Sequence, residues 1–338
     1  MKHLKLLVIT LAATLSACGG GGGGASNQAA DAIQKTYTSS ATAGEVLKYT
    51  VDTSALTYSY EILQSAYGLL GNTGSGTLTK NSDGTYSPSE SPSSKILPLK
   101  NGLLLGNVKL TMSGTSRDVP IFGMENPATT SSDLAGTYNF ITVQCATKSN
   151  GIYTNCFTYY GTVEVTASTS TTATFRSCVG ADITTGTGSC TSSRSGTLTY
   201  LANGVWAMKD SASTFNNYML AFQAPNGQKV GWLDFNDATV FGYGQGVVSQ
   251  QTTLNTYTGI DGSYFYKNTA GTSGSVTLSA NASTQQITGS SGIVVTGNQP
   301  WAGFGKSATG YGLMAGNGIY VYMDRAISNS YYEIGIQK

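Results

Sequence analysis

Asx-Gly dipeptides divide this chain into short segments and constrain its fold more than any other feature of the sequence. Each dipeptide lies between residues that favour β-strands. They are Asp83-Gly84, Asn101-Gly102, Asn203-Gly204, Asn226-Gly227 and Asn317-Gly318. Because Asn-Gly and Asp-Gly adopt the positive φ angles of two-residue hairpin turns, each one predicts a β-hairpin. The sequence therefore predicts a series of consecutive antiparallel strands.

Between those turns, β-prone and small polar residues alternate. The alternation is visible from Leu56 to Ile62, from Gly161 to Thr166 and from Tyr320 to Met323. No window of helical length shows the apolar spacing of an amphipathic helix. We therefore expect an all-β fold, with two or three antiparallel barrel- or sandwich-like units after a flexible N-terminal tether.

Short internal repeats recur in the same order along the chain. Gly76 to Thr79, followed by Asp83-Gly84, matches Gly196 to Thr199, followed by Asn203-Gly204. In a second set, Gly136-Thr-Tyr138-Asn-Phe140 matches Gly262-Ser-Tyr264-Phe-Tyr266, and Gly161 to Ala167 matches Gly274 to Ala280. A Gly-x-aromatic opening strand followed by up-and-down hairpins resembles small closed barrels of the calycin kind and the barrel domains of surface lipoproteins. The resemblance implies closed sheets, which would hide strand edges that carry few charges.

Polar, turn-rich joins divide the body of the chain. One join runs from Asn126 to Ser132 and the other from Ser249 to Thr253. We therefore expect an N-terminal β unit over 41–126, a middle β unit with two disulfides over 127–250 and a C-terminal β unit over 251–338.

The N-terminal segment has the pattern of an export signal. Lys2 and Lys5 precede an apolar run from Leu6 to Ala13, which is too short to span a bilayer. The run leads to Leu15-Ser16-Ala17-Cys18, which resembles the lipobox of bacterial lipoproteins. The resemblance implies that 1–17 is a lipoprotein signal peptide and that Cys18 is acylated, for example with palmitate. The alternative is an ordinary signal peptide with a chance cysteine at the cleavage site.

A lipid on Cys18 would make the membrane a partner of the protein. Several acyl chains on one residue anchor a protein firmly, whereas one chain does so only marginally. Gly19 and Gly20 follow Cys18, where Asp favours retention in the inner membrane of bacteria whose lipoprotein sorting is understood. By that analogy we expect the protein at the outer membrane, lipid-anchored, with its body facing the periplasm or exposed at the surface. The glycines and the polar residues after them predict a tether over 18–40.

Four further cysteines form two close pairs in a chain expected to enter an oxidising compartment. We expect Cys145 to pair with Cys156 and Cys178 with Cys190, each closing a hairpin, although the other two connectivities stay open. Neither pair has metal-site spacing, so we expect no metal.

Charge and histidine content exclude several function classes. Of 18 basic and 17 acidic residues, Lys2 and Lys5 leave with the signal peptide, and no basic cluster remains to bind nucleic acid. His3, the one histidine, leaves with them, which removes histidine-dependent catalysis and metal binding. Hydrolysis by two carboxylates stays open.

Two segments resemble ligand-binding loops, but each lacks a residue that the motif requires. Gly303 to Ser307 resembles a phosphate loop, but Pro300 stands where that motif needs glycine. Thr79 to Glu90 resembles a calcium loop, but Thr79 stands where the ion needs a carboxylate. We therefore expect no cofactor.

Tyrosine is the residue type in excess, with 21 copies beside 3 Trp and 10 Phe. Trp301, Phe304 and Tyr311 fall in a glycine-rich stretch from Asn298 to Gly318 that resembles a long loop, so they are candidates for a ligand-binding surface. The alternative is ordinary packing in the core. In the adjacent pairs Tyr159/Tyr160 and Tyr331/Tyr332, strand alternation would send one ring to each face.

These observations predict an outer-membrane-anchored lipoprotein that acts as a non-catalytic binding or interaction module at the cell envelope. Its partner would be an envelope glycan or a protein. The alternatives are a carboxylate-dependent glycan-acting enzyme and a purely structural envelope protein.

Overall fold

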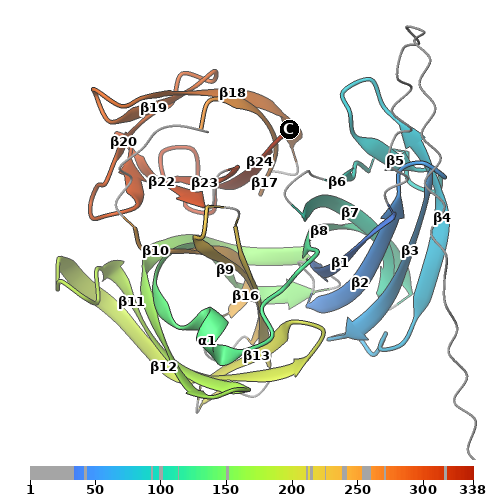
Figure 1. Ribbon diagram of the computed structural model, residues 1–338, viewed down its shortest axis with the longest axis horizontal. Helices are drawn as coiled ribbons and strands as arrows, with labels where there is room; N and C mark the ends of the chain where they lie inside the picture. Colours follow the sequence, from blue (N-terminus) through green and yellow to red (C-terminus); the bar gives the residue numbers. More distant parts are fainter. Residues whose placement is uncertain are drawn as a thin grey trace, which may run out of the picture. The chain divides into compact units, whose positions relative to one another are not determined.

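The fold is all-β, with three sheets that follow one another along the chain (Figure 1). The computed structural model describes residues 34–41, 44–92, 94–98, 102–112, 114–149, 152–210, 212–213, 216–224, 226–237, 242–252, 260–269, 272–315 and 318–338. All of these residues belong to one compact unit, Ile33–Lys338. The all-β prediction is therefore confirmed.

The first sheet has eight strands, drawn from blue to cyan-green in Figure 1. They are β1 (Gln34–Ala41), β2 (Glu45–Asp52), β3 (Thr57–Gln64), β4 (Thr73–Lys80), β5 (Tyr86–Pro88), β6 (Leu97–Pro98), β7 (Leu103–Met112) and β8 (Thr115–Met124). β1 pairs with both β2 and β8, which leaves β5 and β6 at the two ends of the sheet. The backbones of Tyr86 and Ile96 exchange two hydrogen bonds of 2.8 and 2.7 Å, so a single bridge brings those ends together.

The second sheet is a closed antiparallel barrel. Its strands are β9 (Gly136–Ser149), β10 (Ile152–Thr169), β11 (Thr172–Ala181), β12 (Gly188–Ala202), β13 (Val205–Asp210), β14 (Asn217–Gln223), β15 (Lys229–Asp237) and β16 (Gly242–Gln250). A four-residue helix, α1 (Ser131–Leu134), precedes it. We call this sheet the middle barrel.

The third sheet is also a closed antiparallel barrel. Its strands are β17 (Gly262–Asn268), β18 (Ser273–Asn281), β19 (Gln286–Gly289), β20 (Val294–Gly297), β21 (Phe304–Lys306), β22 (Gly310–Ala315), β23 (Ile319–Asp324) and β24 (Tyr332–Gln337). We call it the C-terminal barrel. The second and third sheets lie within the units predicted over 127–250 and 251–338, whereas the first sheet begins at Gln34, before the predicted unit 41–126. Whether each unit folds as a separate domain stays a prediction.

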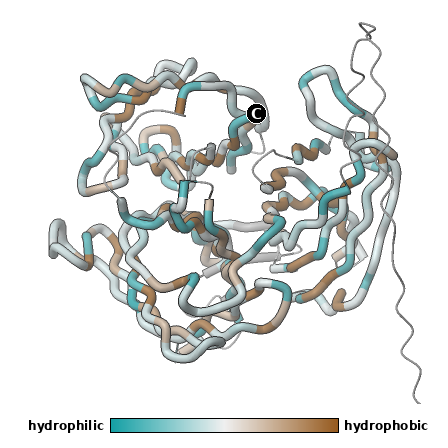
Figure 2. The backbone as a smooth tube through the Cα atoms, viewed as in Figure 1, coloured by the Kyte–Doolittle hydropathy of each residue, from teal (hydrophilic) through white to brown (hydrophobic). Residues whose placement is uncertain are grey.

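Turn chemistry explains the hairpins. Asn203 and Gly204 join β12 to β13 with φ angles of +52° and +77°, the conformation in which a two-residue turn matches the twist of its strands. Along many strands, hydrophobic and hydrophilic positions alternate (Figure 2), whereas β14 and β23 are buried along almost their whole length.

The second set of sequence repeats occupies equivalent places in the two closed barrels. Tyr138 and Tyr264 lie in the first strand of each, and each hydroxyl donates to the carbonyl oxygen four residues upstream, at 2.5 and 2.8 Å. Gly161 in β10 lies opposite Phe140, as Gly274 in β18 lies opposite Tyr266. The two barrels therefore share one up-and-down plan.

The predicted tether is too long at its C-terminal end. β1 begins at Gln34, so residues 34–40 belong to the first sheet. Tyr37 and Ser39 are fully buried although the segment is polar, because β2 and β8 pair with it on both sides. Cys18, the signal peptide and the glycine run lie outside the described residues.

Two kinds of feature are absent from the described residues. Within the described residues, no helix has the length and apolar character needed to cross a membrane. In the same part of the chain, His, Cys, Asp and Glu side chains form no cluster of three or more that could hold a metal ion.

Candidate ligand-binding cavity in the middle barrel

The middle barrel encloses a cavity of about 300 Å³ between the inward-facing side chains of its strands. Alternation along each strand selects those side chains, as in Tyr138, Phe140, Thr142 and Gln144 of β9. An eight-stranded barrel is just wide enough either to be filled by its own side chains or to hold one small ligand. This barrel leaves space inside.

Helix α1 lies at the end of the barrel where β10 turns into β11. The Thr130 hydroxyl donates to Asp133 at 2.6 Å at the start of the helix, and Lys229 Nζ donates to the carbonyl oxygen of Ser132 at 2.9 Å. The helix places fully buried Leu134 over Tyr138, whose hydroxyl donates to the Leu134 carbonyl oxygen. Burial raises the pKa of Tyr138, so that hydroxyl stays protonated. We infer that this end of the cavity is closed.

The wall of the cavity is mainly aliphatic and aromatic. It is formed by Tyr138, Phe140, Tyr159, Val163, Val165, Phe175, Val179, Leu198, Met208, Met219, Leu233, Phe235 and Val248. Apolar walls with a few polar groups are typical of small-molecule sites.

The polar groups come from Thr142, Gln144, Ser177, Ser192 and Arg194. Arg194 is directly opposite Ser177 in the pairing of β11 with β12, and Ser192 is opposite Val179. Facing residues share a side of the sheet, so Arg194 belongs to the interior face. Ser177 and Arg194 also line a groove along the β11–β12 hairpin, so the cavity and the groove meet at these two side chains.

Arg176, on the strand next to that of Arg194, faces the outside of the barrel. Arg176 is on the opposite face of β11 and its Nε lies 2.8 Å from Glu164 Oε2 of β10. This ion pair is outside the barrel. Arg176 and Arg194 are thus close in the sheet but face opposite sides of it.

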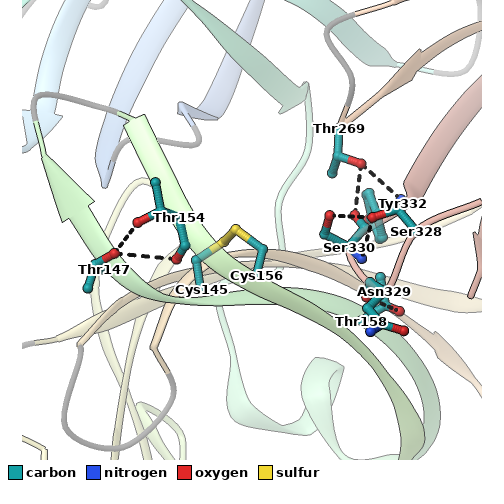
Figure 3. Close-up of a disulfide and its surroundings, with 10 residues drawn as sticks. All are labelled: Cys145, Thr147, Thr154, Cys156, Thr158, Thr269, Ser328, Asn329, Ser330 and Tyr332. Carbon is teal, nitrogen blue, oxygen red and sulfur yellow. Dashed lines mark hydrogen bonds between the residues drawn. A yellow bond between two sulfur atoms is a disulfide. The ribbon is translucent and has the colours of Figure 1, made fainter.

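Both predicted disulfides are present. Cys145 and Cys156 join facing positions of β9 and β10, with 3.9 Å between their Cα atoms (Figure 3). Cys178 and Cys190 join β11 and β12, with 5.5 Å between their Cα atoms, and line the groove that meets the cavity at Arg194. Each disulfide closes a hairpin, as the cysteine spacing predicts.

Trp301, Phe304 and Tyr311, the candidates for a ligand-binding surface, do not line the cavity of the middle barrel. Two of the three are buried. Trp301 is 6% exposed and Phe304 is 1% exposed, while Tyr311 is half-buried. The predicted loop is also wrong, because β21 and β22 lie inside it. The rings of Trp301, Phe304 and Tyr311 pack around Tyr160 of the middle barrel, and the Tyr160 ring stacks on Tyr311 at 3.9 Å between centroids.

Strand alternation in the tyrosine pair of β10 is confirmed. Tyr159 lines the cavity, whereas its neighbour Tyr160 faces outward onto Trp301 and Tyr311. Burial, and then the hydrogen bond to Tyr311, raises the pKa of Tyr160 to about 12. The outward ring is used in packing.

The C-terminal barrel contains a smaller cavity of about 60 Å³. Phe304 lines it, so this residue is next to a cavity although it is not on the surface. Glu333 also lines it and accepts hydrogen bonds from the hydroxyls of Tyr320 and Tyr331, the latter at 2.6 Å. The charged group of this cavity is therefore an acid.

The sequence does not predict the cavity of the middle barrel. Alternation could have identified inward positions such as Val163 and Val165, but not the space left between them. Arg194 stands in a run of serines and threonines that resembles an ordinary surface strand. Only the register of β11 and β12 shows which face it is on.

Comparisons with known proteins add little. No protein-family model matches the chain, and no curated protein matches it. Among solved structures, it is similar to a protein of unknown function from the DUF3598 family of Nostoc punctiforme, with a TM-score of 0.26, 9% identity and coverage of 64% of this chain and 93% of that one. It is also similar to the vaccine antigen transferrin binding protein B of Haemophilus parasuis, with a TM-score of 0.20, 8% identity and coverage of 87% of this chain and 65% of that one. At such low TM-scores, neither structure informs the function of this chain.

Proposed function

We propose that the protein is a lipid-anchored envelope protein whose middle barrel binds a small apolar molecule without catalysis. The observation that carries this proposal is the cavity of about 300 Å³. Ligand pockets usually have volumes of about 300–1,000 Å³ and mostly apolar walls. A ligand that buries its apolar surface there gains about 25 cal/mol for each Å² removed from water.

The chemistry of the cavity wall supports binding over catalysis. Among the described residues that line it, none is a carboxylate, a histidine, a cysteine or a lysine. General acid–base or nucleophilic catalysis usually relies on such groups. The Tyr138 hydroxyl is occupied by the Leu134 carbonyl oxygen. The pair of carboxylates that glycan hydrolysis requires is not found among these residues.

The anchor is proposed from the sequence alone, through the lipobox-like Leu15-Ser16-Ala17-Cys18. A lipid on Cys18 would hold the barrels beside a membrane. By analogy with sorted bacterial lipoproteins, the glycines that follow Cys18 in place of Asp favour the outer membrane. Cys18→Ala should release the exported protein from membranes in a flotation experiment. Continued flotation of this variant with the membranes would contradict lipid anchoring.

The binding proposal is tested with N-phenylnaphthylamine, a neutral apolar dye that fluoresces when removed from water. Titration should give saturable binding with a stoichiometry near one dye per chain. Val163→Phe places a larger ring on the cavity wall and should abolish most of the binding. Thr166→Phe adds a ring on the other face of the same strand and should leave binding unchanged.

Two results of this titration would contradict the proposal. Equal binding by the wild type and Val163→Phe would show that the dye is bound outside the middle barrel. Absence of saturable binding by the wild type would also contradict the proposal. Thermal unfolding of both variants checks that the barrel is folded.

A further inference from the structure

One charge distinguishes the wall of the middle-barrel cavity. Of the described residues that line it, Arg194 is the one with an ionised side chain at neutral pH. The guanidinium group keeps its charge at all physiological pH values. A molecule inside the cavity therefore meets a single fixed positive charge.

The position of Arg194 separates the polar part of the cavity from the apolar part. Ser177 and Ser192 are its close neighbours on the interior face of β11 and β12. Leu198, further along β12, is buried, whereas Arg194 is exposed. The guanidinium therefore stays in contact with water, and the buried wall offers mainly apolar contacts.

Arg194 is also available to a ligand. No described carboxylate forms an ion pair with it, whereas Arg176 is paired with Glu164 on the outer face. A planar guanidinium donates two parallel hydrogen bonds to a carboxylate, which fixes the orientation of the head group as well as attracting its charge.

We propose that Arg194 binds the carboxylate head group of an amphipathic ligand whose hydrocarbon chain occupies the cavity of the middle barrel. This inference rests on the proposed function and specifies its ligand class, a medium-chain carboxylate. The C-terminal barrel has the opposite arrangement, since Glu333 lines its smaller cavity. Like charges repel, so the carboxylate is directed to the middle barrel.

The test compares decanoate with decanol, which has the same chain length and a neutral head group. Their dissociation constants are measured with the full-length protein by displacement of bound N-phenylnaphthylamine at neutral pH. Decanoate should bind about fivefold more tightly than decanol, the size expected for an ion pair in contact with water.

Two arginine variants complete the test. Arg194→Gln should weaken decanoate binding about fivefold and leave decanol binding unchanged. Unchanged decanol binding also shows that the variant is folded. Arg176→Gln removes a charge on the outer face of the neighbouring strand and should change neither constant.

The possible failures are distinguishable. If decanoate and decanol bind equally to the wild type, the role of Arg194 is wrong while the apolar site stands. If Arg176→Gln weakens decanoate binding as much as Arg194→Gln, the preference comes from the general field of the barrel, which also overturns the inference. If neither ligand displaces the dye and the dye itself does not bind, the proposed function fails with it.

Discussion

The indole Nε1–H of Trp301 donates a hydrogen bond of 2.8 Å to the side-chain Oδ1 of Asn139, across the contact between the C-terminal and middle barrels. The Asn139 side-chain amide in turn donates to the carbonyl oxygen of Ala302 at 2.8 Å. Asn139 is fully buried on the outer face of β9. Of the two alternatives that the sequence left open for Trp301, a ligand-binding surface and core packing, the structure favours packing, in which the ring satisfies a buried amide.

Trp301→Ala should lower the free energy of unfolding by about 3–5 kcal/mol, because it removes a large buried ring. It also leaves the Asn139 oxygen without this donor, which adds to the loss. Equilibrium denaturation in urea measures the change. Phe157→Ala, at a position that is 48% exposed, serves as the control and should cost little. A Trp301→Ala variant as stable as the wild type would contradict the packing role.

Replacing Cys178 and Cys190 together by serine should lower the free energy of unfolding by about 2–3 kcal/mol, since the closed loop is short. These residues line the groove that meets the cavity at Arg194, so decanoate affinity should also fall. Replacing Cys145 and Cys156 should lower stability and leave affinity unchanged. Denaturation curves and ligand titrations of the two double variants separate these effects, and equal affinities in both would contradict a link between the groove and the site.

Asp182 should make stability depend on pH in the acid range. Burial alone would raise the pKa of this carboxyl, but hydrogen bonds from Thr184, Thr185 and Gln251 lower it below its ordinary value. The ionised form is thus favoured in the folded state. The stability it provides is present above the unfolded-state pKa of about 3.9 and is lost as the pH falls below it.

Asp182→Asn should therefore destabilise the protein by about 1–3 kcal/mol at neutral pH and by less in strong acid. Urea denaturation at neutral pH and near the acid end of the transition gives the two values. A stability difference that stays constant with pH would contradict the assigned role of the carboxylate.

Decanoate binding should weaken with added salt, whereas decanol binding should not. Arg194 is exposed, and mobile ions screen such a charge over about 10 Å at 0.1 M ionic strength. Titrations in dilute and concentrated sodium chloride measure both constants. Equal salt dependence of the two ligands would show that the head group is not bound through its charge.

The sequence predicted the strands well because turn chemistry is local. Asn203 and Gly204 adopt the turn that their residue types favour, and the opening tyrosines of the repeats take equivalent places in two barrels. The disulfide pairs follow from the short spacing between their cysteines. These features depend on neighbours in the sequence.

Three other features depend on contacts between distant segments. β1 is polar and becomes a strand because β2 and β8 pair with it. The glycines of β21 and β22 made those strands resemble a loop, yet they allow close packing, since a Cβ on Gly305 would lie 2.2 Å from Val295. The cavity depends on the summed volumes of side chains from eight strands, and no local pattern reports that sum.

The most direct measurement of the central claim uses methyl NMR of protein labelled at its methionines. Met208 and Met219 line the cavity of the middle barrel, Met314 lines the smaller cavity of the C-terminal barrel, and Met112 is buried in the first sheet. Addition of decanol should shift the methyl signals of Met208 and Met219 in a saturable manner and leave those of Met112 and Met314 unchanged. Unchanged signals of Met208 and Met219, or a shift confined to Met314, would contradict a ligand site in the middle barrel.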